Sequence, residues 1–170
     1  MMAHHGVSGL VGKVVTELEL NCDADEYYKV YKHHQLVPNE AVSHLFTGVK
    51  ALEGGDGLSP VHIKEWSYIL EGKTMTAVEE STYDDETRTI SHRIVEGDVM
   101  KDYKKFDEIV VAKPKPDGHG SIVSISIMYE KINEDSPTPF DILKTFHQNI
   151  LDLSAHICAS EYPYDVPDYA

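Results

Sequence analysis

One histidine of the chain lies between two isoleucines in the alternating stretch RTISHRIVEG. Ile90, His92 and Ile94 fall on one face of a predicted β-strand, and the two isoleucines indicate that this face is buried. Because the ordinary pKa of an imidazole is about 6.5, a histidine in a cavity wall can act as a general base or proton shuttle near neutral pH. The alternative is a packed, hydrogen-bonded core histidine, and the stretch is compatible with both.

A carboxylate is the second candidate, in the stretch KKFDEIVVAKP. One strand phase places Asp107 on a face with Ile109 and Val111. The other phase turns Phe106, Glu108 and Val110 inward and leaves the aspartate in water. We favour the first phase. A carboxylate in an apolar pocket has a raised pKa unless it is paired, so Asp107 is a candidate to orient His92, to hold a ligand ammonium group or to transfer a proton.

The stretch HIKEWSYIL also has two phases. One phase groups His62, Lys64, Trp66 and Tyr68, and the other groups Ile63, Glu65 and Ser67. We favour the first phase for the inner face because it brings the two aromatic residues together, and Trp66 is the only tryptophan of the chain. An aromatic floor suits a flat cationic ligand through stacking and cation–π attraction. Ordinary core packing would produce the same pattern.

The rest of the sequence predicts the elements that must position these side chains. Alternating runs separated by turn residues indicate strands, and caps with helical spacing indicate helices. The predicted strands are 14–21, 49–54, 61–70, 73–84, 88–98, 104–114 and 120–132, and the predicted helices are 22–34, 39–46 and 138–159. This order predicts an α+β fold in which a curved, seven-stranded antiparallel sheet wraps the long last helix around an internal hydrophobic cavity.

The last predicted helix is amphipathic. Thr138 is expected to cap it, with Pro139 at the first helical position. Its stripe at helical spacing consists of Phe140, Leu143, His147, Ile150, Leu151, Ser154 and Ile157. Five of these residues are expected to close the cavity: Phe140, Leu143, His147, Ile150 and Leu151. His147 is a second polar candidate there, although a histidine on a helix face is more often structural.

The chain has 170 residues and ends in YPYDVPDYA, which is the influenza haemagglutinin epitope tag. We therefore expect one domain, 1–161, followed by an engineered tail, 162–170. Without Asp165 and Asp168 of the tag, the formal net charge changes from −14 to −12. An acidic surface repels nucleic acid and anionic membranes, so neither is an expected partner.

A few sequence features bear on the cellular compartment of the protein and on whether it binds a metal ion. No apolar run approaches the roughly 18 residues of a membrane span, and the first residues, MMAHHGVSGLVGK, lack the apolar core of a signal peptide. Cys22 and Cys158 are far apart and have no metal or redox spacing, so two thiols in a reducing cytosol are the expectation, with a disulfide as the alternative. No histidine pair has metal-ligand spacing, and no metal site is expected.

Several sequence pieces together resemble one known family. They are GVSGLVGK, LEGGDGLSPVHIKEW, VEGDVMKDYKKF, KPDGHGSIVSISIMYEK and the closing SPTPF. The chain resembles the pathogenesis-related class 10 and major latex protein family, the superfamily of the major birch-pollen allergen, over nearly its whole length outside the tag. The resemblance implies a hydrophobic central pocket with no metal and no organic cofactor. Within the family, the sequence is most similar to poppy-latex members that act on benzylisoquinoline and morphinan alkaloids.

That resemblance implies a cofactor-free morphinan isomerase that moves a β,γ double bond into conjugation and so converts neopinone to codeinone. His92 is the candidate base and proton shuttle, and Asp107 would orient it or hold the substrate ammonium group. Lys64 or Tyr68 would donate a hydrogen bond to the enolate oxygen. The expected substrate-binding residues are Trp66, Ile90, Ile94, Ile109, Val111, Phe140, Leu143 and His147.

Two other functions stay open at this point. One is an elimination of acetate in the same pocket, as in the formation of thebaine. The other is non-catalytic binding or storage of benzylisoquinoline alkaloids. In all three cases the implied partner is a small-molecule alkaloid and the implied location is the latex cytosol. The sequence is compatible with a monomer or a homodimer.

Overall fold

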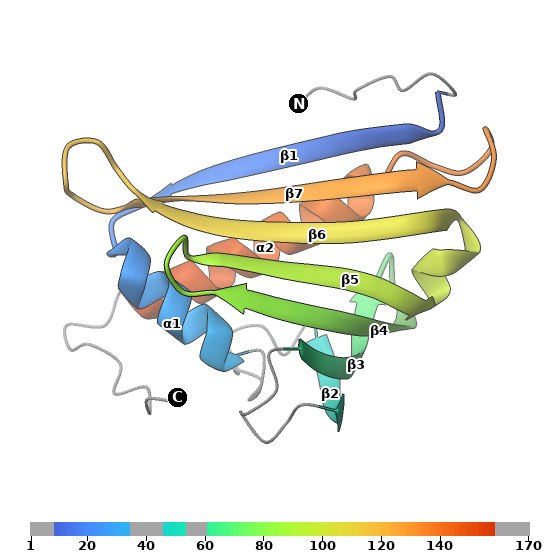
Figure 1. Ribbon diagram of the computed structural model, residues 1–170, viewed down its shortest axis with the longest axis horizontal. Helices are drawn as coiled ribbons and strands as arrows, with labels where there is room; N and C mark the ends of the chain where they lie inside the picture. The colour runs from blue at the N-terminus through green and yellow to red at the C-terminus, as the bar shows by residue number, and fades with distance from the viewer. Residues whose placement is uncertain (1–8, 35–45, 54–60, 159–170) are drawn as a thin grey trace.

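The computed structural model describes residues 9–34, 46–53 and 61–158, and the tag lies outside them. Within the described residues, one seven-stranded antiparallel sheet has the order β1-β7-β6-β5-β4-β3-β2 (Figure 1). The strands are β1 (Val11–Leu20), β2 (Phe46–Glu53), β3 (Val61–Leu70), β4 (Lys73–Asp84), β5 (Thr89–Gly97), β6 (Tyr103–Pro114) and β7 (Ser121–Lys131). The helices are α1 (Ala24–His34), the 3₁₀ turn η2 (Asp98–Lys101) and α2 (Phe140–Cys158). The predicted α+β class is confirmed.

The strands form where side chains alternate between the two faces of the sheet. β7 shows this most regularly, because every second residue from Ser121 to Tyr129 is buried. Figure 1 shows α2 running across one face of the sheet, with α1 near one end of it. The buried core joins both layers, with Val14, Ile125 and Ile127 from the sheet and Leu153 from α2. Fully burying an aliphatic side chain of this size contributes about 1.5–3 kcal/mol.

The predicted stripe of α2 is correct at its centre and wrong at two positions. Leu143, Ile150, Ser154 and Ile157 are buried. Phe140 is instead 44% exposed and Leu151 is 38% exposed. Successive residues of an α-helix are separated by about 100° around its axis. Leu151 therefore points away from the sheet that its neighbour Ile150 contacts, and Phe140 lies at the very start of the helix.

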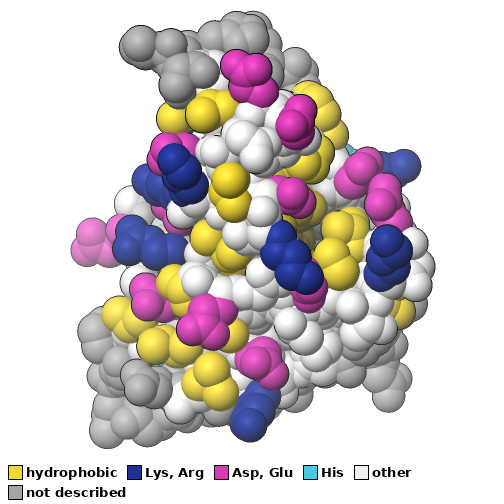
Figure 2. Space-filling model, turned by 90° about the vertical axis from the view of Figure 1, so that its right-hand side faces the viewer, with side chains coloured by type: hydrophobic (Ala, Val, Ile, Leu, Met, Phe, Trp, Pro, Cys, Tyr) yellow, Lys and Arg dark blue, Asp and Glu magenta, His cyan; other side chains and the backbone are white. Residues whose placement is uncertain are grey.

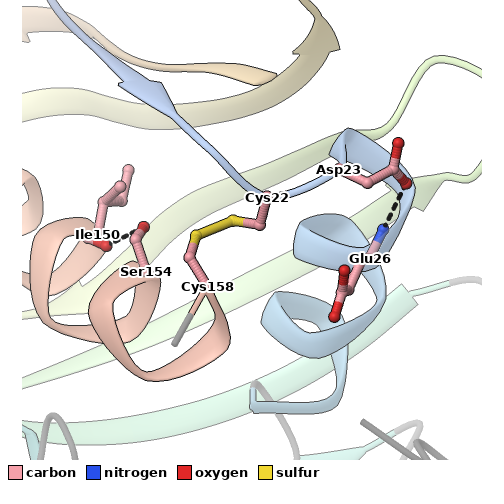
Figure 3. The surroundings of a disulfide bond; sticks show 6 residues. All are labelled: Cys22, Asp23, Glu26, Ile150, Ser154 and Cys158. Atoms are coloured by element: carbon pink, nitrogen blue, oxygen red, sulfur yellow. Dashed lines mark hydrogen bonds between the residues drawn. A yellow bond between two sulfur atoms is a disulfide. The ribbon is translucent and has the colours of Figure 1, made fainter. Parts of the chain in front are cut away.

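The beginning of α1 is held by a side-chain cap. Asp23 Oδ2 accepts a hydrogen bond from the backbone N–H of Asp25 at 3.0 Å. It accepts a second from the backbone N–H of Glu26 at 3.2 Å (Figure 3). This arrangement satisfies donors that the first turn of a helix leaves without an intrahelical partner. The predicted second short helix, 39–46, lies outside the described residues except for Phe46, which begins β2.

The two cysteines form a disulfide, Cys22–Cys158, so the expectation of two thiols is wrong (Figure 3). The fold brings the segment between β1 and α1 beside the last turn of α2, although 136 residues separate the cysteines in sequence. Their Cα atoms are 5.0 Å apart, within the usual range for a disulfide. In the part of the chain that the structure describes, no helix is long and apolar enough to cross a membrane.

Candidate functional site

A pocket lies between the inner face of the sheet, α1 and α2. Its sheet residues are Trp66, Tyr68, Leu70, Ala77, Glu79, His92, Ile94, Phe106 and Glu108, joined by Val99 of η2. Its helix residues are Tyr31 of α1 and Ile142, Thr145, Phe146 and Asn149 of α2. Most of these side chains are aliphatic or aromatic, so the polar groups among them lie in largely apolar surroundings. Such a cavity is typical of a site for a small apolar ligand.

The register of the sheet brings the polar residues of the pocket into adjacent rows. One row runs across four strands and consists of His62, Ser81, His92 and Glu108. In the next row, Lys64 on β3 lies opposite Glu79 on β4. Residues directly opposite each other in an antiparallel pair have Cβ atoms about 4.5–5.5 Å apart. His92 and Glu108 are therefore neighbours in the pocket wall.

A hydrogen-bonded relay fixes the imidazole of His92. Its Nδ1 lies 2.6 Å from Ser81 Oγ, and that hydroxyl donates to Glu79 Oε1 at 3.3 Å. A serine hydroxyl has one proton. Because Ser81 gives this proton to Glu79, the network is satisfied when Nδ1 carries a proton and donates it to Ser81. Nε2 then keeps its lone pair and is the basic nitrogen.

Burial keeps this imidazole neutral. His92 is only 2% exposed. Desolvation lowers its pKa below the ordinary value, and the nearby charge of Glu79, whose Oε1 is 3.4 Å from Nδ1, acts in the opposite direction. The net direction is downward, so the histidine is a neutral base at physiological pH.

Glu79 connects several of the buried polar groups. The indole N–H of Trp66 donates to Glu79 Oε1 at 2.5 Å, and Lys64 Nζ lies 3.7 Å from the same oxygen. Lys64 is 1% exposed and also donates to the hydroxyl of Tyr83 at 3.1 Å. Burial lowers the pKa of Lys64, and Glu79 partly counteracts this. Lys64 therefore supports Glu79 rather than lining the pocket.

Glu108 supplies a different kind of carboxyl group. It is 5% exposed, and burial followed by the negative charge of Glu79 raises its pKa well above the ordinary value. Burial and the charge of Glu79 therefore favour its protonated form, which can donate a hydrogen bond. Burial also raises the pKa of Tyr68 to about 12, so its phenol stays protonated. The pocket thus presents a base and two proton-bearing donors.

Four of the predicted site residues lie in the pocket wall: Tyr68, Trp66, His92 and Ile94. Ile90 is 1% exposed and belongs to the core. The inner phase predicted for β3 is correct, since His62, Lys64 and Trp66 are buried and Tyr68 lines the pocket.

The inward orientation predicted for Asp107 is wrong. Its carboxylate lies on the outer face of the sheet, 3.7 Å from Arg93 Nε and 3.5 Å from Lys105 Nζ. Ile109 and Val111 share that outer face and are half-buried, while Phe106, Glu108 and Val110 are buried on the inner face. Both faces of β6 carry aliphatic residues, so alternation alone did not decide the phase. Asp107 and Ile109 line a separate groove on the outer face.

The side of α2 that faces the pocket also differs from the prediction. Leu143 is buried in the core, Phe140 is exposed, and His147 is tied to the sheet by a 2.7 Å hydrogen bond between its Nδ1 and Thr16 Oγ1. None of these three is among the pocket-lining residues. The helix instead contributes Ile142, Thr145, Phe146 and Asn149.

Sequence reasoning missed four polar residues of the site, Tyr31, Glu79, Thr145 and Asn149, and favoured the wrong phase for Glu108. The stretch TAVEES carries the signal for Glu79, because Ala77, Glu79 and Ser81 alternate on one face of β4. The acidic Glu79 at the centre of this pattern concealed that this face is the buried one. Among residues 9–34, 46–53 and 61–158, no group of three or more His, Cys, Asp or Glu side chains is placed to hold a metal ion.

Comparison with protein families decides the classification. Residues 9–160 match the model of the "Pathogenesis-related protein Bet v 1 family". The chain belongs to this family. Among the relatives of this Bet v 1 family protein are two from Papaver somniferum. Major latex protein 22 is 59% identical over 93% of this chain and 98% of its own length, and major latex protein 146 is 56% identical over 94% of this chain and 100% of its own length.

Solved structures of similar proteins support the same fold. A crystal structure of major latex-like protein 151 from Panax ginseng has a TM-score of 0.76 and 25% identity, covering 86% of this chain and 97% of that one. A solution structure of an Arabidopsis thaliana member of the major latex protein family has a TM-score of 0.63 and 32% identity, covering 91% of this chain and 99% of that one. This Bet v 1 family protein therefore has a ligand-binding fold, and proteins of its family bind small hydrophobic ligands.

Proposed function

We propose that this Bet v 1 family protein is a cofactor-free isomerase that converts neopinone to codeinone by moving a β,γ double bond into conjugation with the ketone. The observation that carries the proposal is the pairing of His92, a neutral base, with Glu108, a neutral acid, as neighbours in one apolar pocket. Its similarity to latex proteins of the opium poppy supports the choice of a morphinan substrate and of the latex cytosol as its location.

The reaction begins with a proton transfer to His92. Nε2 takes a proton from the carbon between the ketone and the double bond, and the electron pair of that C–H bond moves toward the ketone oxygen to form a dienolate. The imidazolium that forms is stabilised by Glu79, directly and through Ser81. Nε2 then returns the proton to the γ-carbon, and the double bond lies between the α- and β-carbons. No atom or electron is gained or lost.

The dienolate carries its negative charge mainly on oxygen and therefore needs hydrogen-bond donors. Glu108, whose carboxyl group is protonated, and Tyr68, whose phenol is protonated, both line the pocket. Donors held in a water-poor pocket stabilise a developing oxyanion strongly because they need no reorganisation during the reaction. Glu108 thus takes the role that Asp107 cannot fill from the outer face, and Lys64 acts through Glu79.

The test is the turnover of neopinone in heavy water, with the product mass and the position of deuterium read out. The native protein is expected to form codeinone faster than the blank, and deuterium enters the γ-carbon in proportion to the exchange of the Nε2 proton with solvent before its return. His92→Asn should lose about 10²- to 10⁴-fold in kcat, the usual contribution of general acid–base catalysis. His147→Asn is the matched control and should retain full turnover, because His147 bonds to Thr16 away from the pocket lining.

Two results would contradict the proposal. Turnover that survives in His92→Asn would remove His92 as the base. No acceleration by the native protein, with Trp66 fluorescence still quenched by codeinone, would indicate a non-catalytic alkaloid-binding protein. Release of acetate from an acetylated morphinan precursor, without isomerisation of neopinone, would indicate an elimination catalyst that uses the same pocket.

A further inference from the structure

One polar side chain of the pocket has a hydrogen-bonding atom without a partner. Asn149 of α2 is 6% exposed and lines the pocket. Its carbonyl oxygen, Oδ1, is buried and makes no hydrogen bond. A buried amide that has given up its hydrogen bonds to water without replacing them destabilises a protein. Asparagine is also a weak helix former. Nothing in the folding of α2 accounts for an asparagine at this position.

Other polar side chains of the same helix are satisfied locally. The hydroxyl of Thr145, one turn earlier on the pocket side, donates to the carbonyl of Asp141 at 3.0 Å. The amide of Gln148 donates to Asp152 at 2.9 Å. Asn149 therefore differs from Thr145 and Gln148 in that it lines the cavity and has a buried acceptor that no described group satisfies. The missing partner is a hydrogen-bond donor that enters the pocket.

The composition of the pocket indicates the chemistry of that donor. The lining residues that the structure describes include the carboxylate of Glu79, beside the protonated carboxyl group of Glu108, and neither lysine nor arginine. The face of the molecule shown in Figure 2, in contrast, has basic and acidic side chains interspersed among apolar ones. Aromatic rings, including those of Trp66 and Phe146, supply faces that attract cations. An apolar cation with a single N–H, which is a protonated tertiary amine, matches all of these features.

We propose that Asn149 Oδ1 accepts the N–H hydrogen bond of a protonated tertiary amine and so fixes the orientation of the ligand in the pocket. Asn149 lies on α2, which crosses the inner face of the sheet (Figure 1). With the ammonium group held at the helix, the opposite end of the ligand faces His92 and Glu108 on β5 and β6. Asn149 is a positioning residue and takes no part in proton transfer. The inference rests on the proposed function only for the identity of the substrate.

The experiment compares two ligands that differ in one hydrogen-bond donor. Codeinone is a tertiary amine and carries an N–H when protonated, whereas its N-methyl quaternary salt has the same charge and no N–H. Binding is followed at neutral pH by the fluorescence of Trp66, the single tryptophan, which lines the pocket. Asn149→Leu should weaken codeinone binding about 10- to 100-fold, as expected for a buried hydrogen bond to a charged group. Binding of the quaternary salt should change less than 2-fold.

Two further variants keep the result interpretable. Gln148→Ala, on the exposed side of α2, should leave the binding of both ligands unchanged because its amide bonds to Asp152 outside the pocket. Asn149→Asp retains an acceptor of nearly the same shape and should retain the preference for the tertiary amine. Asn149→Leu without ligand should unfold at higher urea concentration than the native protein, because the unsatisfied amide is gone.

Some outcomes overturn the inference. Equal losses for both ligands in Asn149→Leu would mean that the residue shapes the pocket without accepting the N–H. Unchanged codeinone binding would mean that Oδ1 has no ligand partner. The binding assay does not depend on turnover. A protein that fails to isomerise neopinone but discriminates the two ligands through Asn149 would therefore disprove the proposed reaction and leave this inference standing.

Discussion

Glu79 Oε1 lies 3.4 Å from His92 Nδ1, and Ser81 is hydrogen-bonded to both residues. The two residues are 13 positions apart in sequence and come from neighbouring strands, β4 and β5. The carboxylate holds the imidazole through its Nδ1 side and leaves Nε2 for a ligand. Glu79 is therefore a positioning residue. Its replacement should change the pKa of His92 and the rate at which His92 transfers a proton.

Glu79→Gln should lower kcat and move the acidic limb of the pH profile of kcat/KM to lower pH. The negative charge of Glu79 raises the pKa of His92, which burial otherwise lowers. Removing the charge lowers that pKa further, so the base stays unprotonated to lower pH but accepts a proton less readily. Glu80→Gln, whose side chain faces the outer groove, is the control and should leave the profile unchanged. An acidic limb that moves to higher pH would contradict this role.

Glu108→Leu should reduce kcat about 10²- to 10³-fold, the usual effect of removing one oxyanion donor. Glu108→Gln should retain a larger part of the activity because its amide still donates a hydrogen bond. The measurement is single-turnover conversion of neopinone by each variant. Equal activity of the leucine and glutamine variants would show that Glu108 does not act as a donor.

Glu108→Gln should also make the protein more stable above about pH 5, and the gain should increase with pH. The pKa of Glu108 is raised in the folded state by burial and by Glu79. A group with a raised folded pKa contributes stability below its unfolded pKa of about 4.5, and this contribution is lost as the pH rises toward the folded pKa. Urea unfolding of the native and variant proteins between pH 4 and pH 8 measures the difference. A gain that is independent of pH would indicate better packing instead.

Asp107→Asn should leave neopinone turnover within about 2-fold of the native value. Its carboxylate faces Arg93 and Lys105 on the outer face, and both partners are more than half exposed. Exposed ion pairs contribute at most about 1 kcal/mol, so the change in unfolding free energy should be small. Steady-state kinetics and urea unfolding check both statements. A loss of turnover like that of His92→Asn would place Asp107 in the reaction after all.

Replacing both Cys22 and Cys158 by serine should lower the free energy of unfolding by about 2–4 kcal/mol, the usual effect of removing a disulfide. A reductant should destabilise the native protein by a similar amount and leave the double variant unchanged. Denaturant unfolding with and without reductant measures both. Two thiols that react with a thiol reagent in the unfolded, unreduced native protein would contradict the pairing.

Much of the fold could be predicted from local patterns. Alternation located the strands. The isoleucines two residues before and after His92 correctly predicted that its side chain faces inward. The grouping of Trp66 with Tyr68 correctly chose the inner face of β3. In these cases the apolar or aromatic neighbours two residues away all lie on one face, so a single phase buries them.

Other features needed contacts between distant segments. In β6, one phase buries Ile109 and Val111 and the other buries Phe106 and Val110, so the strand by itself does not choose between Asp107 and Glu108. The choice is made by pairing with β5, which sets Glu108 opposite His92. In α2, helical spacing located the buried stripe, but the packing of the helix against the sheet decided that Asn149 rather than His147 lines the pocket.

The sequence by itself determined the order of the elements, the amphipathic character of the last helix, the inward position of His92 and the family to which the chain belongs. These properties depend on side chains within a few residues of one another, which share a face because of backbone geometry. Only the tertiary structure decided that Glu79, Ser81 and Glu108 surround His92, that Asn149 faces the cavity and that Cys22 meets Cys158. Those residues lie on separate elements, and only strand register and the packing of α2 bring them into contact.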